Sequence, residues 1–366
     1  GYGADVWFEV ESGTDTAFFN LVDFITLNDM TDPTYYEAAL NKIDMLNWVD
    51  YFALQIFIEN GEWLDLLENN IRIFKSYAPD MKWKYILWDL TYGQSCANCN
   101  TLQGSLENPH NSLYCDMFNA MLENDEFENY FINRFADLIN YYFTAEISSE
   151  LIDANKAEIE SEIPAQNSRW YTGSLATWNT NVTNLKNFYA NRIPNQRNHI
   201  ETYFGLNDQI DVTINVNPPG AGYIKISTLI PQELPWTGVY FDGVPVTLTA
   251  IANPGFAFVD WDDNIFITDE SMITFTNNFT DNTSFTANFT GAAIANPIIV
   301  SEINYNSDIT TNSGDWIELH NNSDVPVTLT DYVLSTPLFY NSFRFPDNTI
   351  IPAHGYLVVV ENSELF

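Results

Sequence analysis

The spacing of apolar residues changes near Leu206, and this change limits the possible folds more than any other feature. Before it, apolar residues recur every three or four positions, as in DMLNWVDYFALQIFIEN (44–60), which predicts helices. After it, short runs such as DVTINVNP (211–218) alternate with period two, which predicts strands. The chain is therefore expected to be multidomain, mainly α at first and all β afterwards.

The 366 residues suffice for two or three domains. Eleven Lys and Arg residues precede Leu206, but only Lys225 and Arg344 follow it, which supports a division there. A second break lies at GAAIANP (291–297). We therefore predict domains at 1–206, 207–291 and 292–366.

Helix signals are clear in the first part. Asp32 is expected to be an N-cap with Pro33 at the first helical position, and Gly61 to follow the end of the 44–60 helix. Pro194 is expected to break or kink a later helix. Further helices are predicted over 112–143, 149–163 and 183–204, and loops rich in Gly, Asn and Ser over 96–112 and 165–176.

The net charge is −36, from 49 acidic and 13 basic residues. Such a charge repels phosphate backbones and anionic lipid surfaces, so we expect neither a nucleic-acid partner nor membrane-surface binding. No run of 18 apolar residues occurs, and no membrane span is predicted. The expected partner is a protein substrate or a surface component. Both ends of the sequence look cut, so we expect it to be a piece of a longer chain.

The segment NNIRIFKSYAPDMKWKYILWDL (69–90) is predicted to form two antiparallel strands. A turn centred between Pro79 and Asp80 pairs residues whose numbers sum to 159, which sets Asn70 beside Asp89, with a slip of one or two positions left open. An amide and a carboxylate oxygen can share a hard cation such as Mg²⁺. The alternative is a loop asparagine pair and an aspartate held by backbone amides.

The spacing around this hairpin matches the order of a protein-kinase site. There a catalytic Asp is followed five residues on by a metal-binding Asn, and a strand pair then leads to a metal-binding Asp near a Gly. Asp65 and Asn70 have the first spacing, and Gly93 lies four residues after Asp89. This pattern predicts Asp65 as a catalytic residue.

The chain resembles the CotH kinase-like proteins, which are related to spore coat protein H. The likeness covers about residues 1–206 and is carried by segments 16–63, NNIRIFK (69–75), KWKYILWDLTYG (82–93) and 185–206. The resemblance implies the C-terminal lobe of an atypical kinase that phosphorylates secreted or surface proteins with ATP and Mg²⁺ or Mn²⁺. It implies that Asn70 and Asp89 bind the metal.

Two departures from the family pattern bear on activity. The family's turn aspartate is matched by Glu62 in NGEW, or by Asp65 by spacing, so the catalytic base is one of these two. The second aspartate of Trp-Asp-x-Asp is Thr91 here. The nucleotide-binding lysine of the N-terminal lobe is expected outside this sequence. The alternative function is therefore a pseudokinase in a cell-surface adhesion or scaffold protein.

Three cysteines leave several possibilities open. Cys96, Cys99 and Cys115 could bind zinc together with His110. Alternatively, Cys115 forms a disulfide with one of the other two, or the thiols are free.

The two β segments resemble known surface modules. Residues 207–291 are similar to the divergent internalin-type B repeat, with a Pro-Gly-Phe turn and Trp261 closing the next strand. Residues 292–366 resemble the first part of a lamin tail domain, an immunoglobulin-like sandwich. Both resemblances imply spacing, adhesion or display, and a secreted or surface location in bacteria. The lamin-tail likeness is carried by Ser301, Glu302, Trp316, Glu318 and Asn321.

Overall fold

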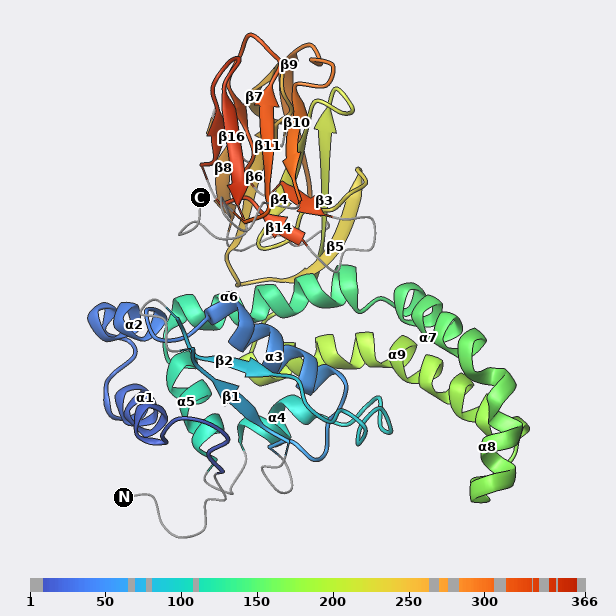
Figure 1. The fold of residues 1–366 in the computed structure, drawn as a ribbon. Helices are drawn as coiled ribbons and strands as arrows, with labels where there is room; N and C mark the ends of the chain where they lie inside the picture. The colour runs from blue at the N-terminus through green and yellow to red at the C-terminus, as the bar shows by residue number, and fades with distance from the viewer. Residues whose placement is uncertain are drawn as a thin grey trace.

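Helices form the first part of the chain and strands the second, as Figure 1 shows. The last helix ends at Phe204 and the next strand begins at Gln209. The predicted fold class, a mainly helical part with a small hairpin followed by all-β parts, is confirmed. The computed structural model describes residues 9–64, 70–76, 81–107, 112–262, 270–275, 283–305, 314–330, 332–335, 342–346 and 348–360.

The helical part also contains one short β-hairpin. Its helices α7 and α8 lead away from the rest and return along α9 (Figure 1). The described elements are α1 (Thr16–Leu27), α2 (Pro33–Leu40), α3 (Met45–Phe57), β1 (Arg72–Phe74), β2 (Lys84–Ile86), α4 (Thr101–Leu106), α5 (Leu113–Leu122), α6 (Asp125–Asp137), the π-helix η1 (Leu138–Tyr142), α7 (Ala145–Ile159), the 3-10 helix η2 (Glu160–Glu162), α8 (Ile163–Trp170) and α9 (Leu175–Phe204).

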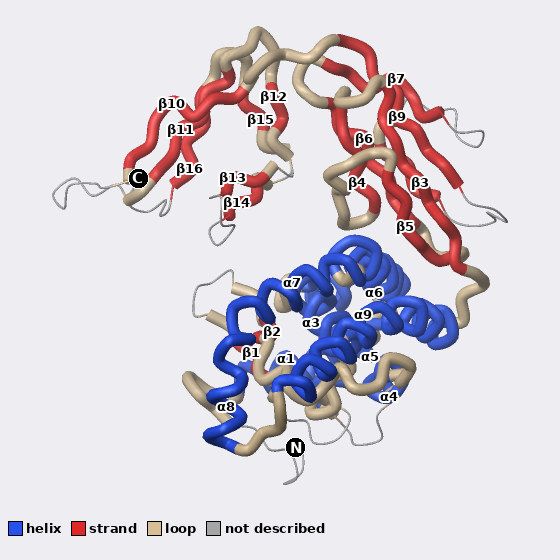
Figure 2. Tube along the Cα trace, turned by 90° about the vertical axis from the view of Figure 1, so that its right-hand side faces the viewer, coloured by secondary structure: helices blue, strands red, loops and turns tan. Residues whose placement is uncertain are grey.

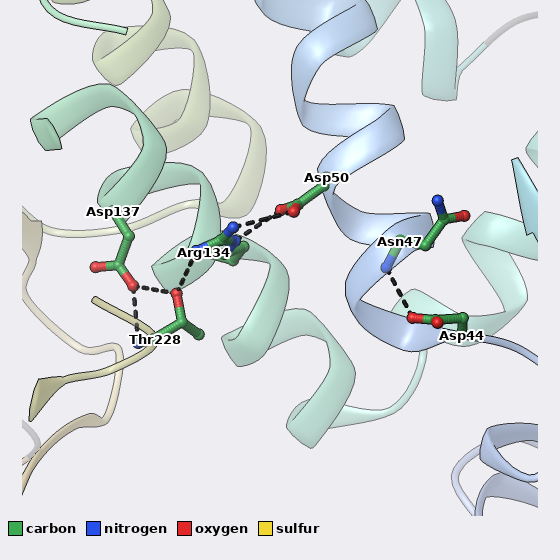
Figure 3. Close-up of polar contacts among 6 residues, drawn as sticks. All are labelled: Asp44, Asn47, Asp50, Arg134, Asp137 and Thr228. Carbon is green, nitrogen blue, oxygen red and sulfur yellow. Dashed lines mark hydrogen bonds and ion pairs between the residues drawn. The ribbon is translucent and has the colours of Figure 1, made fainter. Parts of the chain in front are cut away.

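Side-chain caps fix the starts of α2 and α3. The Asp32 carboxylate accepts a hydrogen bond from the Thr34 amide, with Pro33 at the first helical position, as predicted. Asp44 caps α3 by accepting from the Asn47 amide at 3.0 Å (Figure 3). The end of α3 differs from the prediction: the helix stops at Phe57, four residues before Gly61.

Three other sequence predictions were wrong in detail. α9 runs continuously through Pro194. Pro194 lies on the exposed face of α9, so the carbonyl that loses its intrahelical bond can be hydrated. The predicted loops 96–112 and 165–176 contain α4, the last six of the eight residues of α8 and the start of α9. The Asn100 and Ser174 side chains cap α4 and α9, so these polar residues mark helix starts as well as loops.

The core of the helical part is aromatic. Phe52 of α3 stacks on Phe118 of α5 with ring centroids 3.8 Å apart and meets the Trp63 ring edge-on at 4.9 Å. Phe118 also meets Phe127 and Phe131 of α6, at 5.4 and 5.1 Å. All five rings are at most 1% exposed, so α3, α5 and α6 are fixed to one another by ring packing.

The first β part consists of two small sheets. One has the order β5-β3-β9-β7, in which β3 and β9 are parallel, and the other has the order β4-β6-β8. The sequence reasoning missed β5, where Gly238 interrupts the pattern; its missing Cβ makes room for the Trp236 ring, 2.3 Å from the ideal Cβ position. The strands are β3 (Gln209–Asn217), β4 (Gly222–Ile226), β5 (Trp236–Phe241), β6 (Val246–Ala252), β7 (Phe256–Asp262), β8 (Met272–Phe275) and β9 (Thr283–Gly291).

The last β part has a separate small core. Its Asn321 side chain is fully buried and donates to the carbonyls of Val325, Ile351 and Pro352, which joins three segments. The sheets have the order β10-β11-β16, with the pairs β12-β15 and β13-β14 beside them. The strands are β10 (Ile298–Asn304), β11 (Trp316–Asn321), β12 (Val327–Thr328), β13 (Val333–Ser335), β14 (Ser342–Arg344), β15 (Ile350–Ile351) and β16 (Tyr356–Val360).

The first β part is docked on the helical part, and one cluster of buried apolar side chains includes residues of both. Figure 2 shows the strands of the two β parts in two groups, with β5 reaching the helices. At this contact the Asp137 carboxylate accepts from the Thr228 amide at 2.9 Å, the Thr228 hydroxyl at 2.6 Å and the Tyr240 hydroxyl at 2.6 Å. Arg134 donates to the Thr228 hydroxyl and, through two nitrogens, to Asp50 of α3 (Figure 3).

We expect Asp137→Asn to remove a pH-dependent part of the free energy of unfolding. Burial raises the pKa of Asp137 from 3.8 to about 6, although hydrogen bonds from Thr228 and Tyr240 oppose the shift. Because the folded pKa is raised, this contribution to stability is complete below about pH 4 and is lost as the pH rises through about 6. Two pKa units correspond to on the order of 2–3 kcal/mol.

Urea unfolding between about pH 4 and 7 measures this effect. The wild type should gain stability over Asp137→Asn as the pH falls. Asp125→Asn, at the exposed start of the same helix, serves as the control and should track the wild type. A difference between wild type and Asp137→Asn that stays constant with pH would contradict the prediction.

Candidate functional site

The hairpin β1–β2 is fixed to the start of α3. The Asn47 side chain pairs with the β2 backbone as a neighbouring strand would: its Oδ1 accepts from the Tyr85 amide at 2.7 Å and its Nδ2 donates to the Tyr85 carbonyl at 3.2 Å. The Trp83 carbonyl accepts from the Asp44 amide at 3.0 Å. Lys84 pairs with the Asp44 carboxylate at 3.0 Å. These bonds give the hairpin one position on α3.

The hairpin register differs by one residue from the predicted one. Arg72 pairs with Ile86 and Phe74 with Lys84, so partner numbers sum to 158 instead of 159. The described pairing ends at positions 74 and 84, and the predicted turn residues Pro79 and Asp80 lie outside the described residues. Asn70 and Asp89 nevertheless flank the same end of the hairpin.

The two faces of the hairpin differ in burial. Tyr85 points inward and stacks on Tyr51 of α3 with ring centroids 4.4 Å apart. Phe74 and Ile86 are each 44% exposed on the other face. At the end near Asn70 and Asp89, the Arg72 guanidinium lies over the Trp88 ring, 4.0 Å from its centroid.

Two loops meet at this end of the hairpin: the first site loop (residues 58–64) and the second site loop (residues 87–95). The Gly61 amide donates to the Tyr92 carbonyl and the Gln94 amide to the Ile58 carbonyl, both at 2.9 Å. A Cβ on Gly93 would lie 2.7 Å from the Ile58 carbonyl oxygen. Gly93 is therefore needed where the two backbones touch, beyond any role as a turn residue.

Left-handed backbone is concentrated in these segments. Glu59, Asn70, Asp89 and Gln94 have φ of 57°, 60°, 46° and 57°, and they are four of the nine non-glycine residues with positive φ in the described chain. Non-glycine residues rarely adopt this conformation, and such residues cluster at functional sites. The backbone supports a site here independently of the sequence spacing.

The structure brings two of the predicted site residues together. The Asn70 Nδ2 atom donates to Glu62 Oε2 at 3.5 Å. Asp89 is exposed and its Oδ1 accepts from the Thr91 hydroxyl at 2.7 Å. Asp65 lies outside the described residues. The metal-binding role of Asn70 and Asp89 and the identity of the base stay predictions.

A buried arginine and a glutamate, both missed by the sequence reasoning, hold the second site loop and its continuation. The Arg192 guanidinium of α9 donates to the carbonyls of Ile56 and Phe57 at the end of α3 and to those of Ala97 and Cys99. Burial lowers the pKa of Arg192 to about 10, which still leaves it charged at neutral pH. The Glu59 carboxylate accepts from the amide of Ser95, the last residue of the loop, and from that of Cys96 just beyond it, at 2.7 Å each.

Neither residue carries a strong sequence signal. Arg192 stands four residues before Gln196 and eight before Ile200, all three buried, so helical spacing could have placed it on the inner face of its helix. Glu59 follows Ile58, the C-cap of α3, at a position where left-handed backbone is usually provided by glycine rather than by glutamate. Its contacts lie 36 and 37 positions along the chain, beyond the reach of local patterns.

The predicted disulfide between Cys115 and one of the other two cysteines was wrong, and so was the predicted zinc site that uses all three. Cys96 and Cys99 form a disulfide with each other. Cys115 is buried on α5, and its sulfur lies 3.3 and 3.2 Å from the Ser105 and Leu106 carbonyls. Packing of α5 against α4 thus keeps Cys115 from the other two, and the set of three cysteines is not assembled. His110 lies outside the described residues.

We expect Arg192→Met to destabilise the protein by at least about 3 kcal/mol, because it leaves buried carbonyl acceptors without a donor. Arg169→Met, on the exposed part of α8, should change stability by less than about 0.5 kcal/mol. Urea unfolding measures both values. Hydrogen exchange should also be faster at the Gly61 and Gln94 amides in Arg192→Met. Equal unfolding midpoints for the two variants would show that the guanidinium contributes little.

In the described part of the chain, no helix is both long enough and apolar enough to span a bilayer. Three family models match the chain: CotH kinase protein over residues 5–194, divergent InlB B-repeat domain over 213–293 and lamin tail domain over 292–365. These findings confirm the three resemblances. Searches of curated proteins and of solved structures found no match. The CotH kinase model spans 190 of the 366 residues, so the chain belongs to the CotH kinase protein family.

Proposed function

We propose that the helical part is a metal-dependent protein kinase domain that transfers phosphate from ATP to a protein at the end of the hairpin. The observation that carries this proposal is the joining of the two site loops, both with left-handed residues, beside the hairpin end that presents Asn70 and Asp89. The family match supports a nucleotide and a divalent cation as cofactors.

The side chains present fit a hard cation. Asn70 donates through Nδ2 to Glu62, which leaves its Oδ1 for a metal. Asp89 accepts from the Thr91 hydroxyl at Oδ1, which leaves its Oδ2 for the metal. Amide and carboxylate oxygens are the ligands that Mg²⁺ and Mn²⁺ prefer. When bound, the cation supplies positive charge that neutralises the phosphate oxygens during transfer.

Glu62 is the proposed general base. Its carboxylate contacts Asn70, so it lies beside the proposed metal ligands, and its amide donates to the buried Asn60 side chain, which fixes the loop. A carboxylate here can accept the proton of a substrate hydroxyl. Asp65 remains the alternative, because it has the kinase spacing to Asn70.

We place the purine base of the nucleotide on the exposed face of the hairpin. Trp88 is 50% exposed and directly precedes Asp89, and the Arg72 guanidinium covers its ring. An aromatic ring with a guanidinium offers a flat surface for stacking, and Arg72 offers positive charge to phosphates. Both properties favour a purine nucleotide near the proposed metal ligands.

The site of action is a secreted or surface location in bacteria. The Cys96–Cys99 disulfide is typical of oxidising compartments. The lamin tail and B-repeat models follow the kinase model along the chain, which supports a role for the β parts in display. The second candidate function is a pseudokinase scaffold, and the observation that favours it is Thr91, where the family pattern has a second carboxylate.

Asp89→Ala decides between these functions. We expect the wild type, within its complete natural chain, to bind Mg²⁺-ATP, and Asp89→Ala to bind it at least about tenfold more weakly, because a first ligand of the cation is lost. Calorimetric titration with ATP in Mg²⁺ or Mn²⁺ measures this. Asp324→Ala, in the last β part, is the matched control and should bind as the wild type does.

Phosphate transfer to a generic protein substrate then tests the base. Glu62→Gln should abolish transfer while retaining Mg²⁺-ATP binding, and Asp65→Asn should retain transfer. The reverse result assigns the base to Asp65. Equal nucleotide binding by wild type and Asp89→Ala excludes this metal site and leaves the scaffold function.

A further inference from the structure

A turn directly after the second site loop brings two cysteines and a glutamate together. Cys96 and Cys99 have Cα atoms 5.4 Å apart, and the Cys99 amide donates to the Cys96 carbonyl at 3.2 Å. An oxygen of Glu59 and the two Sγ atoms all lie within 4.8 Å of one another. Cys99 is exposed, so the group is accessible from solvent.

We propose that reduction of the Cys96–Cys99 disulfide converts this turn into a binding site for a thiophilic divalent cation of the Zn²⁺ class, with Glu59 as the third ligand. This site is separate from the four-ligand cysteine set of the sequence analysis, because it uses neither Cys115 nor His110. It is also separate from the proposed Mg²⁺ site.

The ligand set suits zinc. Two thiolates and one carboxylate supply three ligands, and water takes the fourth position of the tetrahedron. Ligands of such an ion lie about 3.5 Å apart, which small side-chain rotations reach from the present spacing. Glu59 is already oriented: Oε2 accepts from the Ser95 and Cys96 amides and from the Ser95 hydroxyl at 3.1 Å, whereas among the described residues Oε1 has a single longer contact, 3.3 Å from the same hydroxyl. Hydrogen bonds that orient a ligand in this way strengthen metal binding.

The charges also balance. Two thiolates and the Glu59 carboxylate carry three negative charges, so a divalent ion leaves a net charge of −1. The Arg192 guanidinium donates to the Ala97 and Cys99 carbonyls in the same turn, and its positive charge interacts favourably with Glu59. A buried cation beneath the turn therefore compensates the remaining charge.

The disulfide form and the metal-bound dithiol form of the turn exclude one another chemically. A dithiol reductant breaks the S–S bond by giving two electrons and two protons, which leaves two cysteine thiols and the reductant as a cyclic disulfide. Metal binding then releases the two thiol protons to solvent. The dithiol form therefore has the thiolate ligands that the metal needs, and the disulfide form has none.

Anaerobic titration of the full chain with Zn²⁺, after dithiol reduction and removal of the reductant, tests the proposal. We expect the reduced protein to bind one more equivalent of Zn²⁺ than the oxidised protein. Co²⁺ in place of Zn²⁺ should give a thiolate-to-cobalt charge-transfer band in the reduced protein alone. Equal binding in the two redox states, or no such band, would overturn the proposal without any need for a variant.

Matched variants assign the ligands. Cys99→Ser should lose the band, and Glu59→Gln should bind Zn²⁺ about tenfold or more weakly. Cys115→Ala and Asp89→Ala should keep both the band and the extra equivalent, which separates this site from the buried thiol and from the proposed Mg²⁺ site. Retention of the band in Cys99→Ser would exclude the site.

Discussion

The hydrogen bonds from the Arg192 guanidinium to the end of α3 are the contact on which the site geometry depends. The last carbonyls of a helix have no intrahelical partners and carry partial negative charge, so a buried cation there satisfies both needs. The same guanidinium reaches the Ala97 and Cys99 carbonyls, which ties the segment after the second site loop to the start of the first. α9 thus contributes to the site geometry through Arg192.

Asparagine side chains also satisfy backbone amide and carbonyl groups on the unpaired edges of two short strands. Asn47 satisfies both backbone groups of Tyr85 on β2, and Asn140 does the same for Val239 on the edge strand β5. A two-stranded hairpin has marginal stability alone. The Asn47 side chain on α3 bonds the free edge of β2 in the place of a third strand and so stabilises β1–β2. β5 is held to η1 by the two hydrogen bonds of the Asn140 side chain. In both cases a helix fixes a strand through an amide group, with no need for a wider sheet.

Local signals explain what could be predicted from the sequence. The Asp32-Pro33 cap, the helical spacing in 44–57 and the period-two runs after Leu206 each depend on neighbours within a few residues, and the helices and strands that they predicted are present. The wrong predictions involve long-range packing. Burial of Arg192, Gln196 and Ile200 on one face keeps α9 continuous past Pro194, and the packing of α5 on α4 keeps Cys115 from its expected partner. The observed hairpin register differs by one position from the expected pairing, a slip that the sequence had left open.

The charge of the chain bears on how a nucleotide could reach the proposed site. A net charge of −36 repels a polyphosphate, and Glu62 and Asp89 add negative charge at the hairpin end. Arg72 opposes this charge locally, but it is also paired with Glu11 at 2.7 Å. Under the proposed function, free ATP should therefore bind poorly, and the divalent cation should arrive with the nucleotide or before it. Within the proposed function, Thr91 has a physical meaning: a hydroxyl in place of a second carboxylate lowers the negative charge at the proposed metal site, and its hydrogen bond to Oδ1 holds the Asp89 carboxylate.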